Sequence, residues 1–329
     1  MDLSLNQRSF HSIESMRTFT LKLIEVNPQG FCGGVVAAIT KIKKLRTDRP
    51  EAKITVLGNL VHNRFIQEAL DSLNILTLEA KGKTRLELLD EIEDGIVVFT
   101  AHGISDSVRK KAQEKGLEVL DASCPFVLQT QAEVKKRLDE GFVIFYIGKK
   151  GHPEAEALTS GDDRIFLIEH SEDIPKNIKQ KIFVTNQTTM SILDTQALFD
   201  EIFKLYPQSV LHDEICSATR VRQNAVLSLQ EQKPDVLIVV GDPTSNNTRQ
   251  LADIGRKAHV PQIIPIETAA DLDLSLIDPE ATVAITSGAS APTLLRKQVV
   301  NKLKSGLDPE PFKPAELLET TFRPIKKKD

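Results

Sequence analysis

The stretch KLIEVNPQGFCGGVVAAITKIKKL, residues 22–45, decides the fold of this chain. It joins a short apolar run to a glycine-rich loop that contains Cys32, and the loop leads into apolar residues at helical spacing. A buried strand followed by a polar loop and a helix is the building unit of parallel α/β folds. The stretch therefore predicts an α/β unit with a cysteine at the start of its helix.

The same pattern surrounds the other two cysteines of the chain, Cys124 and Cys216. The three cysteines follow one another at a constant interval of 92 residues. LEVLDASCPFVLQTQAEVKKRL, residues 117–138, and VLHDEICSATRVRQNAVLSL, residues 210–229, again run from an apolar segment through a cysteine to a helical pattern. In the third pattern we expect Val221 on the apolar face. A spacing that repeats together with its surroundings indicates a threefold repeat with one sulfur in each unit.

Three further apolar runs follow in each unit and lead into polar loops. Short apolar runs that alternate with helical patterns are typical of parallel sheets. The sequence predicts an α/β fold of three similar lobes, each with a mainly parallel four-stranded sheet, in a pseudo-threefold arrangement around one centre. The runs lie at 54–58, 142–148 and 236–241, at 73–78, 164–169 and 262–267, and at 97–103, 182–188 and 283–290.

The repeat also predicts the domain organisation. We expect lobe 1 at residues 34–123, lobe 2 at 124–213, and lobe 3 at 21–33 together with 214–308. Residues 1–20 are interpreted as an N-terminal appendage and 309–329 as a C-terminal tail that contains prolines and a lysine run. The appendage lacks the apolar core of a signal peptide, and Met16 is an alternative start.

The composition is that of a globular protein, with 40% hydrophobic and 27% charged residues in a chain of 329. A net charge of −4 gives no electrostatic reason to expect nucleic acid or an anionic membrane as a partner. No apolar run is long enough to cross a bilayer. Three cysteines far apart in the sequence do not suit a disulfide framework, which favours a reducing cytoplasm as the location.

The cysteines are candidates for metal ligation because all three follow strands, where parallel sheets form their ligand crevices. A cysteine at a helix start faces free N–H groups and the positive end of the helix dipole, which favours the thiolate, the metal-binding form. Three thiolates suit an iron–sulfur cluster or zinc. A single such cysteine would be interpreted as a small buried core residue, but the matched positions of three favour a metal.

Polar side chains in the equivalent loops predict an anion pocket beside the thiols. His62, His102 and His152 follow strands, where a protonated imidazole or loop N–H groups hold phosphate. Glu154 can carry a proton to a substrate, or it can complement a helix dipole. No Walker A loop or dinucleotide fingerprint indicates ATP or NAD. The small hydroxyl and amide side chains at the other strand ends are Thr188, Thr189, Ser245, Asn247 and Ser290.

Together these motifs resemble the 4-hydroxy-3-methylbut-2-enyl diphosphate reductase family, the last enzyme of the non-mevalonate isoprenoid pathway. The matching pieces run in the family's order between about residues 21 and 300. They are NPQGFCGGV (27–35), VHN (61–63), AHGIS (101–105), DASCP (121–125), GHPE (151–154), QTTMS (187–191), DEIC (213–216), TSNNT (244–248) and GASAP (288–292).

The resemblance implies a [4Fe–4S] cluster at the centre of the three lobes. Cys32, Cys124 and Cys216 would be its ligands, and one iron would stay open. The substrate would bind this iron through its 4-hydroxyl group. Two electrons and two protons would then remove the oxygen as water, and the products would be isopentenyl diphosphate and dimethylallyl diphosphate.

The resemblance also implies roles for the surrounding residues. Glu154 would donate a proton, Thr188 would position the hydroxyl group, and ferredoxin or flavodoxin would supply electrons. Asn246 stands where the family commonly has serine. A contact from the backbone of this residue to the diphosphate would survive that difference. The residues implied to bind the substrate and line the pocket are His62, His102, His152, Thr189, Ser245, Asn246, Asn247 and Ser290.

Two alternatives stay open on the sequence. One is another three-cysteine iron–sulfur enzyme of threefold architecture, such as a quinolinate-synthase-like dehydratase, although the GHPE and QTT loops argue against it. The other is a non-catalytic module that binds zinc or no metal. Substrate competition separates the first from the reductase, and metal analysis of protein purified without air separates the second.

Overall fold

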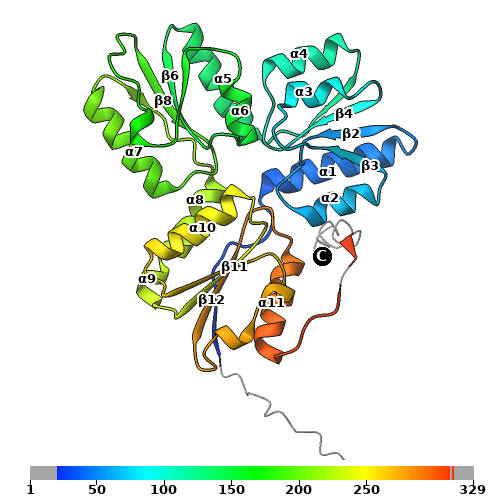
Figure 1. Ribbon diagram of the computed structural model, residues 1–329, viewed down its shortest axis with the longest axis vertical. Coiled ribbons are helices and arrows are strands. Elements are labelled where there is room, and N and C mark those ends of the chain that lie inside the picture. The colour runs from blue at the N-terminus through cyan, green and yellow to red at the C-terminus, as the bar shows by residue number, and fades with distance from the viewer. Residues whose placement is uncertain (1–20, 312, 315–329) are drawn as a thin grey trace, which may run out of the picture.

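Three α/β lobes surround a common centre in the computed structural model (Figure 1), which describes residues 21–311 and 313–314. The predicted appendage at 1–20 and most of the predicted tail at 309–329 lie outside the described residues. Each lobe contains one four-stranded sheet, and every strand pairing in the described residues is parallel. The predicted fold class is confirmed.

Lobe 1 has the strand order β3-β2-β4-β5. Its inner strands are buried along their whole length, as expected of strands covered by helices on both faces. The strands are β2 (Ile54–Leu57), β3 (Ile75–Leu78), β4 (Ile96–Phe99) and β5 (Glu118–Asp121). The helices are α1 (Gly33–Asp48), α2 (Arg64–Asp71), α3 (Arg85–Asp90) and α4 (Asp106–Glu114).

Lobe 2 repeats this order as β7-β6-β8-β9. Its strands are β6 (Val143–Ile147), β7 (Ile165–Ile168), β8 (Ile182–Asn186) and β9 (Val210–Leu211), and its helices are α5 (Pro125–Asp139), α6 (Pro153–Thr159) and α7 (Ile192–Leu205), with a 3₁₀ turn at Ser171–Asp173. Three phenylalanines and a tyrosine, Phe145, Phe166, Phe183 and Tyr146, fill much of the space on the two faces of this sheet.

Lobe 3 has the order β1-β12-β10-β11 and joins the two ends of the described chain. Its strands are β1 (Lys22–Glu25), β10 (Val236–Val240), β11 (Gln262–Ile266) and β12 (Thr282–Ser287). Its helices are α8 (Ser217–Leu227), α9 (Leu229–Gln232), α10 (Asn246–Lys257) and α11 (Thr293–Ser305), with 3₁₀ turns at Ala269–Asp271 and Leu274–Leu276. The residue boundaries between the lobes stay a prediction.

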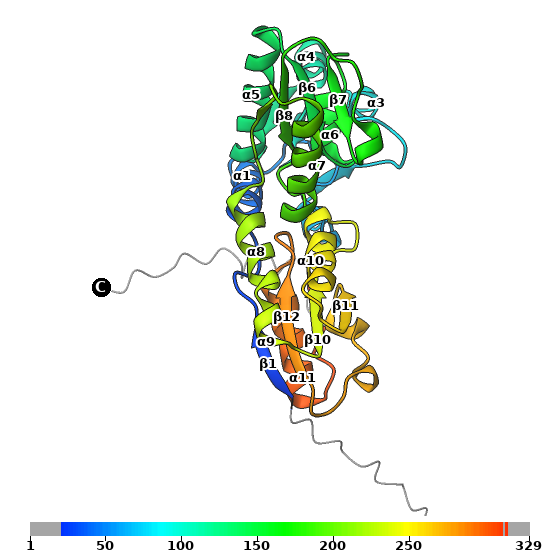
Figure 2. The same ribbon diagram turned by 90° about the vertical axis from the view of Figure 1, so that its left-hand side faces the viewer.

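The strand before each cysteine belongs to the sheet of one lobe, and the helix after it packs in the next. β5 pairs with β4, β9 with β8 and β1 with β12, each as the last strand of its sheet. The cysteine loops are therefore the crossings between lobes, and Figure 2 shows the helices that follow them, α5, α1 and α8, along one edge of the molecule. This arrangement brings three loops that are distant in sequence to one centre.

Two details of the prediction were wrong. The third run of lobe 1 is shorter than 73–78, because Asn74 has a φ of 53° and turns the chain before β3 begins. Val221 is 50% exposed rather than buried. The face of α8 that turns inward carries Arg222, Gln223 and Val226 instead, so this helix buries polar groups toward the centre.

Candidate active site

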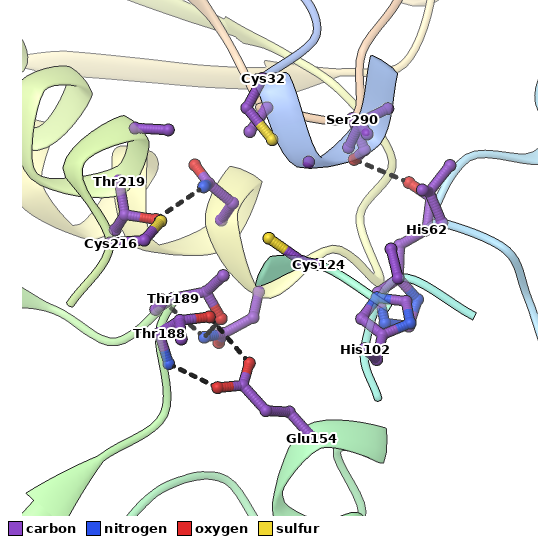
Figure 3. Close-up of a pocket in the computed structure, with 18 of the residues that line it drawn as sticks. Cys32, His62, His102, Cys124, Glu154, Thr188, Thr189, Cys216, Thr219 and Ser290 are labelled. Atoms are coloured by element: carbon purple, nitrogen blue, oxygen red, sulfur yellow. Dashed lines mark hydrogen bonds between the residues drawn. The ribbon is translucent and has the colours of Figure 1, made fainter. Parts of the chain in front are cut away.

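All thirteen side chains predicted for the site line a single pocket between the lobes, shown in Figure 3. Three of them are the cysteines, and each is the N-cap residue of its helix with an extended backbone: Cys32 of α1, Cys124 of α5 and Cys216 of α8. The sequence spacing thus corresponds to an equivalent position in each of three helices.

The cysteine loops are held by three matching hydrogen bonds. The backbone N–H groups of Cys32, Cys124 and Cys216 donate to carbonyl oxygens in the loops that follow β12, β4 and β8, each at 3.0 Å. Because those loops belong to the lobe that each cysteine loop has just left, the bonds join neighbouring lobes at the pocket wall. The acceptors are the carbonyl oxygens of Ala289, Ala101 and Thr188.

All three thiols line this pocket, and two of them lie close to the start of α1. A Cβ atom on Gly34 would lie 2.6 Å from the Cys124 Sγ and 3.9 Å from the Cys32 Sγ, so the helix start needs a residue without a side chain. The Cys216 thiol donates to Thr219 Oγ1 at 3.2 Å. No disulfide joins the cysteines in the described part of the chain. Three soft sulfur ligands around one pocket fit an iron–sulfur cluster, whereas the ligand atoms close enough together for a single ion are those of His62, His102 and His152 in the described residues.

Burial changes the thiol chemistry that the sequence predicted. Burial raises the pKa of Cys124, and the N–H groups of Phe126 and Val127 at the helix start oppose it only in part. Burial likewise raises the pKa of Cys216, against hydrogen bonds from Thr219. The helix start thus acts in the predicted direction, but without a metal these two thiols are protonated at neutral pH. Metal binding would displace those protons.

Three imidazoles form a cluster on the side of the pocket opposite Cys216. The ring centroids of His62 and His102 are 4.6 Å apart, and His152 lies 5.7 and 5.5 Å from them. Burial lowers the pKa of all three rings, that of His152 to about 3. The protonated imidazole that the sequence suggested is therefore wrong for the free pocket, where the rings are neutral N–H donors.

His152 and His62 differ in the hydrogen bonds of their ring nitrogens. His152 is the N-cap residue of α6, and its Nδ1 accepts a hydrogen bond from the Glu154 N–H at 3.1 Å. This contact leaves the Nε2–H of His152 as a donor for a ligand. His62 Nε2 is buried and has no partner among the described residues. A buried donor without a partner is costly, which indicates that a polar ligand completes this part of the pocket.

Glu154 is the one buried carboxyl group in the pocket lining, and its side chain is 2% exposed. Its Oε1 accepts from the Thr188 N–H at 2.7 Å, and its Oε2 accepts from Thr188 Oγ1 at 2.9 Å. Tyr146 Oη donates to Oε1 at 3.4 Å. Burial raises the pKa of Glu154 to about 7, although the hydrogen bonds from Thr188 and Tyr146 work against that rise. The group is balanced between donor and acceptor of a proton at neutral pH.

The small polar residues connect lobe 3 to the other two lobes. Ser290 Oγ donates to the His62 carbonyl at 2.9 Å and lies 3.5 Å from the Oγ of Ser245, the N-cap of α10. Asn246 Nδ2 donates to the backbone oxygen of Thr189 at 2.8 Å and to its Oγ1 at 3.1 Å. The amide of Asn246 is thus already used, and its backbone N–H at the start of α10 remains for an anion.

Three residues of the site were missed on the sequence. Thr219 receives hydrogen bonds from both the Cys216 thiol and the Asn247 amide. Tyr146 supports Glu154 from inside β6, and Arg222 is buried beside the cysteine loops. A tyrosine within an otherwise apolar strand was a usable signal for Tyr146. The arginine had no such signal, because a charged residue in a helix is usually exposed.

Fold and site together define a three-lobed α/β enzyme with a centre lined by thiols, imidazoles and one buried carboxyl group. The chain belongs to the LytB protein family, whose sequence model matches residues 23–304. It is 40% identical to the 4-hydroxy-3-methylbut-2-enyl diphosphate reductase of Macrococcus caseolyticus over 313 residues, covering 93% of this chain and 95% of that one. The reductase of an Exiguobacterium species is 43% identical over 297 residues, with 88% and 92% covered.

Solved structures give the same result. The E-1-hydroxy-2-methyl-but-2-enyl-4-diphosphate reductase of Plasmodium falciparum matches with a TM-score of 0.80 and 27% identity, covering 92% of this chain and 98% of that one. A second reductase structure, described as the terminal enzyme of the non-mevalonate pathway, matches with a TM-score of 0.60 and 28% identity over 87% and 99%. The family resemblance seen in the sequence is confirmed, and it decides between the open alternatives in favour of the reductase.

Proposed function

We propose that this chain reduces 4-hydroxy-3-methylbut-2-enyl diphosphate to isopentenyl diphosphate and dimethylallyl diphosphate. The observation that carries the proposal is the convergence of three N-cap cysteines, three imidazoles and the Glu154–Thr188 pair on one pocket of a LytB-family chain. In the net reaction, the substrate takes up two electrons and two protons, its C–O bond breaks, and the hydroxyl oxygen leaves as water.

The diphosphate binds at the imidazole side of the pocket. His62, His102 and His152 supply neutral N–H donors, and the start of α10 adds backbone N–H groups together with the positive end of its dipole. Ser245, Asn247, Ser290 and Thr189 contribute hydroxyl and amide groups at the rim. Asn246 acts through its backbone N–H group and through the hydrogen bonds that hold Thr189.

Glu154 holds the proton that the leaving hydroxyl group needs. With a pKa raised to about 7, its carboxyl is partly protonated at neutral pH. Thr188 Oγ1 contacts the Oε2 of Glu154 at 2.9 Å and lines the same pocket, so it can relay or orient the hydrogen bond to the substrate hydroxyl. Because the Glu154 carboxyl is buried between the lobes, bulk water does not reach this proton.

Cys32, Cys124 and Cys216 hold a [4Fe–4S] cluster, a proposal that their soft donor set and their approach to one space support. When bound, the cluster supplies electrons one at a time and an iron without a protein sulfur ligand as Lewis acid. We further propose ferredoxin or flavodoxin as the electron donor and the cytoplasm as the location. Among the described residues, no helix is long and apolar enough to cross a membrane.

The test is a comparison of two neighbouring variants purified without air. Cys124→Ser removes one ligand and is expected to lose the iron and the conversion of the hydroxy diphosphate under a strong reductant. Ser123→Ala removes a buried hydroxyl group that does not line the pocket, and it is expected to keep both. Unchanged iron in Cys124→Ser, or full iron without turnover in the parent protein, would contradict the proposal.

A further inference from the structure

Arg222 is a buried charge without a carboxylate partner. It lies on α8, its side chain is 4% exposed, and no aspartate or glutamate of the described chain pairs with it. Its guanidinium group donates to the carbonyl oxygens of Ala218 at 2.9 Å and Gly30 at 2.8 Å, and its Nε has no partner there. Hydrogen bonds to two carbonyl oxygens do not offset the free-energy cost of removing a permanent positive charge from water.

The groups that can balance this charge are cysteine sulfurs. Burial lowers the pKa of Arg222, and the groups that act against this are Cys32 and Cys216, which favour the cation when they are ionised. An arginine keeps its proton in proteins. The guanidinium is therefore a permanent buried charge beside the loop that contains Cys32, and a negatively charged metal centre held by these cysteines would pair with it.

Arg222 also joins two of the cysteine loops mechanically. Gly30 precedes Cys32 by two residues and has a φ of 77°, and its N–H group donates to Ser287 Oγ at 2.9 Å. The hydrogen bond from Arg222 to the Gly30 carbonyl connects this loop to the helix that Cys216 begins. The positive charge is therefore fixed between the loop of Cys32 and the first turns of α8.

We propose that Arg222 is a positioning residue that serves as the built-in counter-ion of the metal–thiolate centre. With a cluster bound, it favours the state with one more electron, because each added electron increases the negative charge beside the cation. This inference rests on the proposed function. It adds that the reduction potential of the centre is set in part by one buried arginine of α8.

The experiment measures the reduction potential of anaerobically prepared holoprotein by titration with dithionite and redox mediators, followed by the paramagnetic resonance signal of the reduced cluster. Arg222→Gln keeps a hydrogen-bond donor for the carbonyls but removes the charge. It is expected to disfavour reduction about tenfold or more, and a tenfold change in a one-electron equilibrium is about 59 mV. Arg222→Lys keeps the charge and is expected to lie close to the parent protein.

Arg46 is the matched control. It too donates only to backbone carbonyls, those of Arg49, Pro50, Ala52 and Asn74, and its Nε also lacks a partner in the described residues. It stands fourteen residues after Cys32 on α1, roughly 21 Å along the helix axis. Arg46→Gln is therefore expected to affect stability but to leave the potential unchanged.

The outcomes separate this inference from the proposed function. A parent protein that binds no cluster overturns both. A parent protein with a cluster whose potential is unaltered by Arg222→Gln, or altered equally by Arg222→Gln and Arg222→Lys, overturns the counter-ion alone. If folded Arg222→Gln loses the cluster, retention of it by Arg222→Lys supports the inference, and loss in both variants contradicts it.

Discussion

At the scale of the residue, the proposed proton donor Glu154 predicts that activity depends on pH. A carboxyl with a pKa of about 7 is half protonated at that pH and only about a tenth protonated one pH unit higher. If the protonated form is the one required, kcat/KM falls as the pH rises through about 7. The pH profile measured under anaerobic conditions with excess reductant checks this, and a flat profile from pH 6 to 8.5 would exclude Glu154 as the essential acid.

Replacement of Glu154 gives the matching prediction. Glu154→Gln preserves the size of the side chain but removes the proton source, and we expect turnover to fall by about 100-fold or more. Iron content is expected to stay unchanged, since the Glu154 carboxyl is not one of the proposed cluster ligands. Glu201→Gln makes the same substitution at an exposed position of α7 and serves as the control. If Glu154→Gln keeps activity within about twofold of the parent protein, Glu154 is not the proton donor.

His62 provides the residue-scale prediction for the diphosphate. Its Nε2 has no partner in the described part of the pocket, so it is available to an anion. His62→Asn is expected to weaken the binding of inorganic diphosphate by roughly tenfold or more, as measured by calorimetry. His259→Asn is a suitable control, because His259 is exposed with a φ of 59°, a conformation that asparagine tolerates. Equal affinity in both variants would contradict the proposed role.

The sequence was a good guide to residues in strand-end loops and a poor one to residues inside elements. Glu154, Thr188 and the histidines could be predicted because loops after parallel strands meet at one edge of a sheet. Arg222 could not, since its importance depends on the Gly30 carbonyl that it meets only in the folded chain, while Tyr146 left only the signal of a tyrosine in an apolar strand. The lowered pKa of the imidazoles was also missed, because burial within a three-lobe junction is a property of the packed structure.

At the scale of the element, the start of α1 packs so closely against the cysteine sulfurs that it leaves no room for a side chain at Gly34. Gly34→Ala adds a methyl group 2.6 Å from the Cys124 sulfur, whereas a Cβ on the adjacent Gly33 meets nothing within 4 Å. We expect Gly34→Ala to lose most of its iron and Gly33→Ala to retain it, with equal or slightly higher stability in the latter. Iron analysis and thermal unfolding of both variants check this. Full iron in Gly34→Ala would show that the sulfurs do not enclose this space.

The strands explain why the elements were largely predictable. Near-continuous apolar runs such as β6 and β10 are buried along their whole length, so their composition alone marks them as inner strands. Edge strands carry less of this signal: β9 has only two residues, both exposed, and its position depends on pairing with β8. Amphipathic spacing was misleading in α8, where Arg222 and Gln223 replace apolar residues on the inner face.

At the scale of the whole molecule, the lobes meet where the cysteine loops cross between them. Iron bound by the cysteines should therefore stabilise the folded chain. Anything that binds only the folded form raises the unfolding temperature. Removal of iron by anaerobic chelation is expected to lower the unfolding midpoint by roughly 5 °C or more. Cys124→Ser should already show the lower midpoint and should not respond to the chelator. An identical midpoint before and after iron removal from the parent protein would show that the centre does not join the lobes.

In the proposed function, three cysteines from three lobes hold one iron–sulfur cluster at which the hydroxy diphosphate is reduced. Quantitation of iron and acid-labile sulfide in anaerobically purified protein, together with turnover of 4-hydroxy-3-methylbut-2-enyl diphosphate by the same sample, tests it most directly. We predict about four irons and four sulfides per chain, and conversion to isopentenyl and dimethylallyl diphosphate in proportion to the iron content. Protein that contains zinc or no metal, or that is full of iron and sulfide yet leaves the substrate unchanged, would contradict the claim.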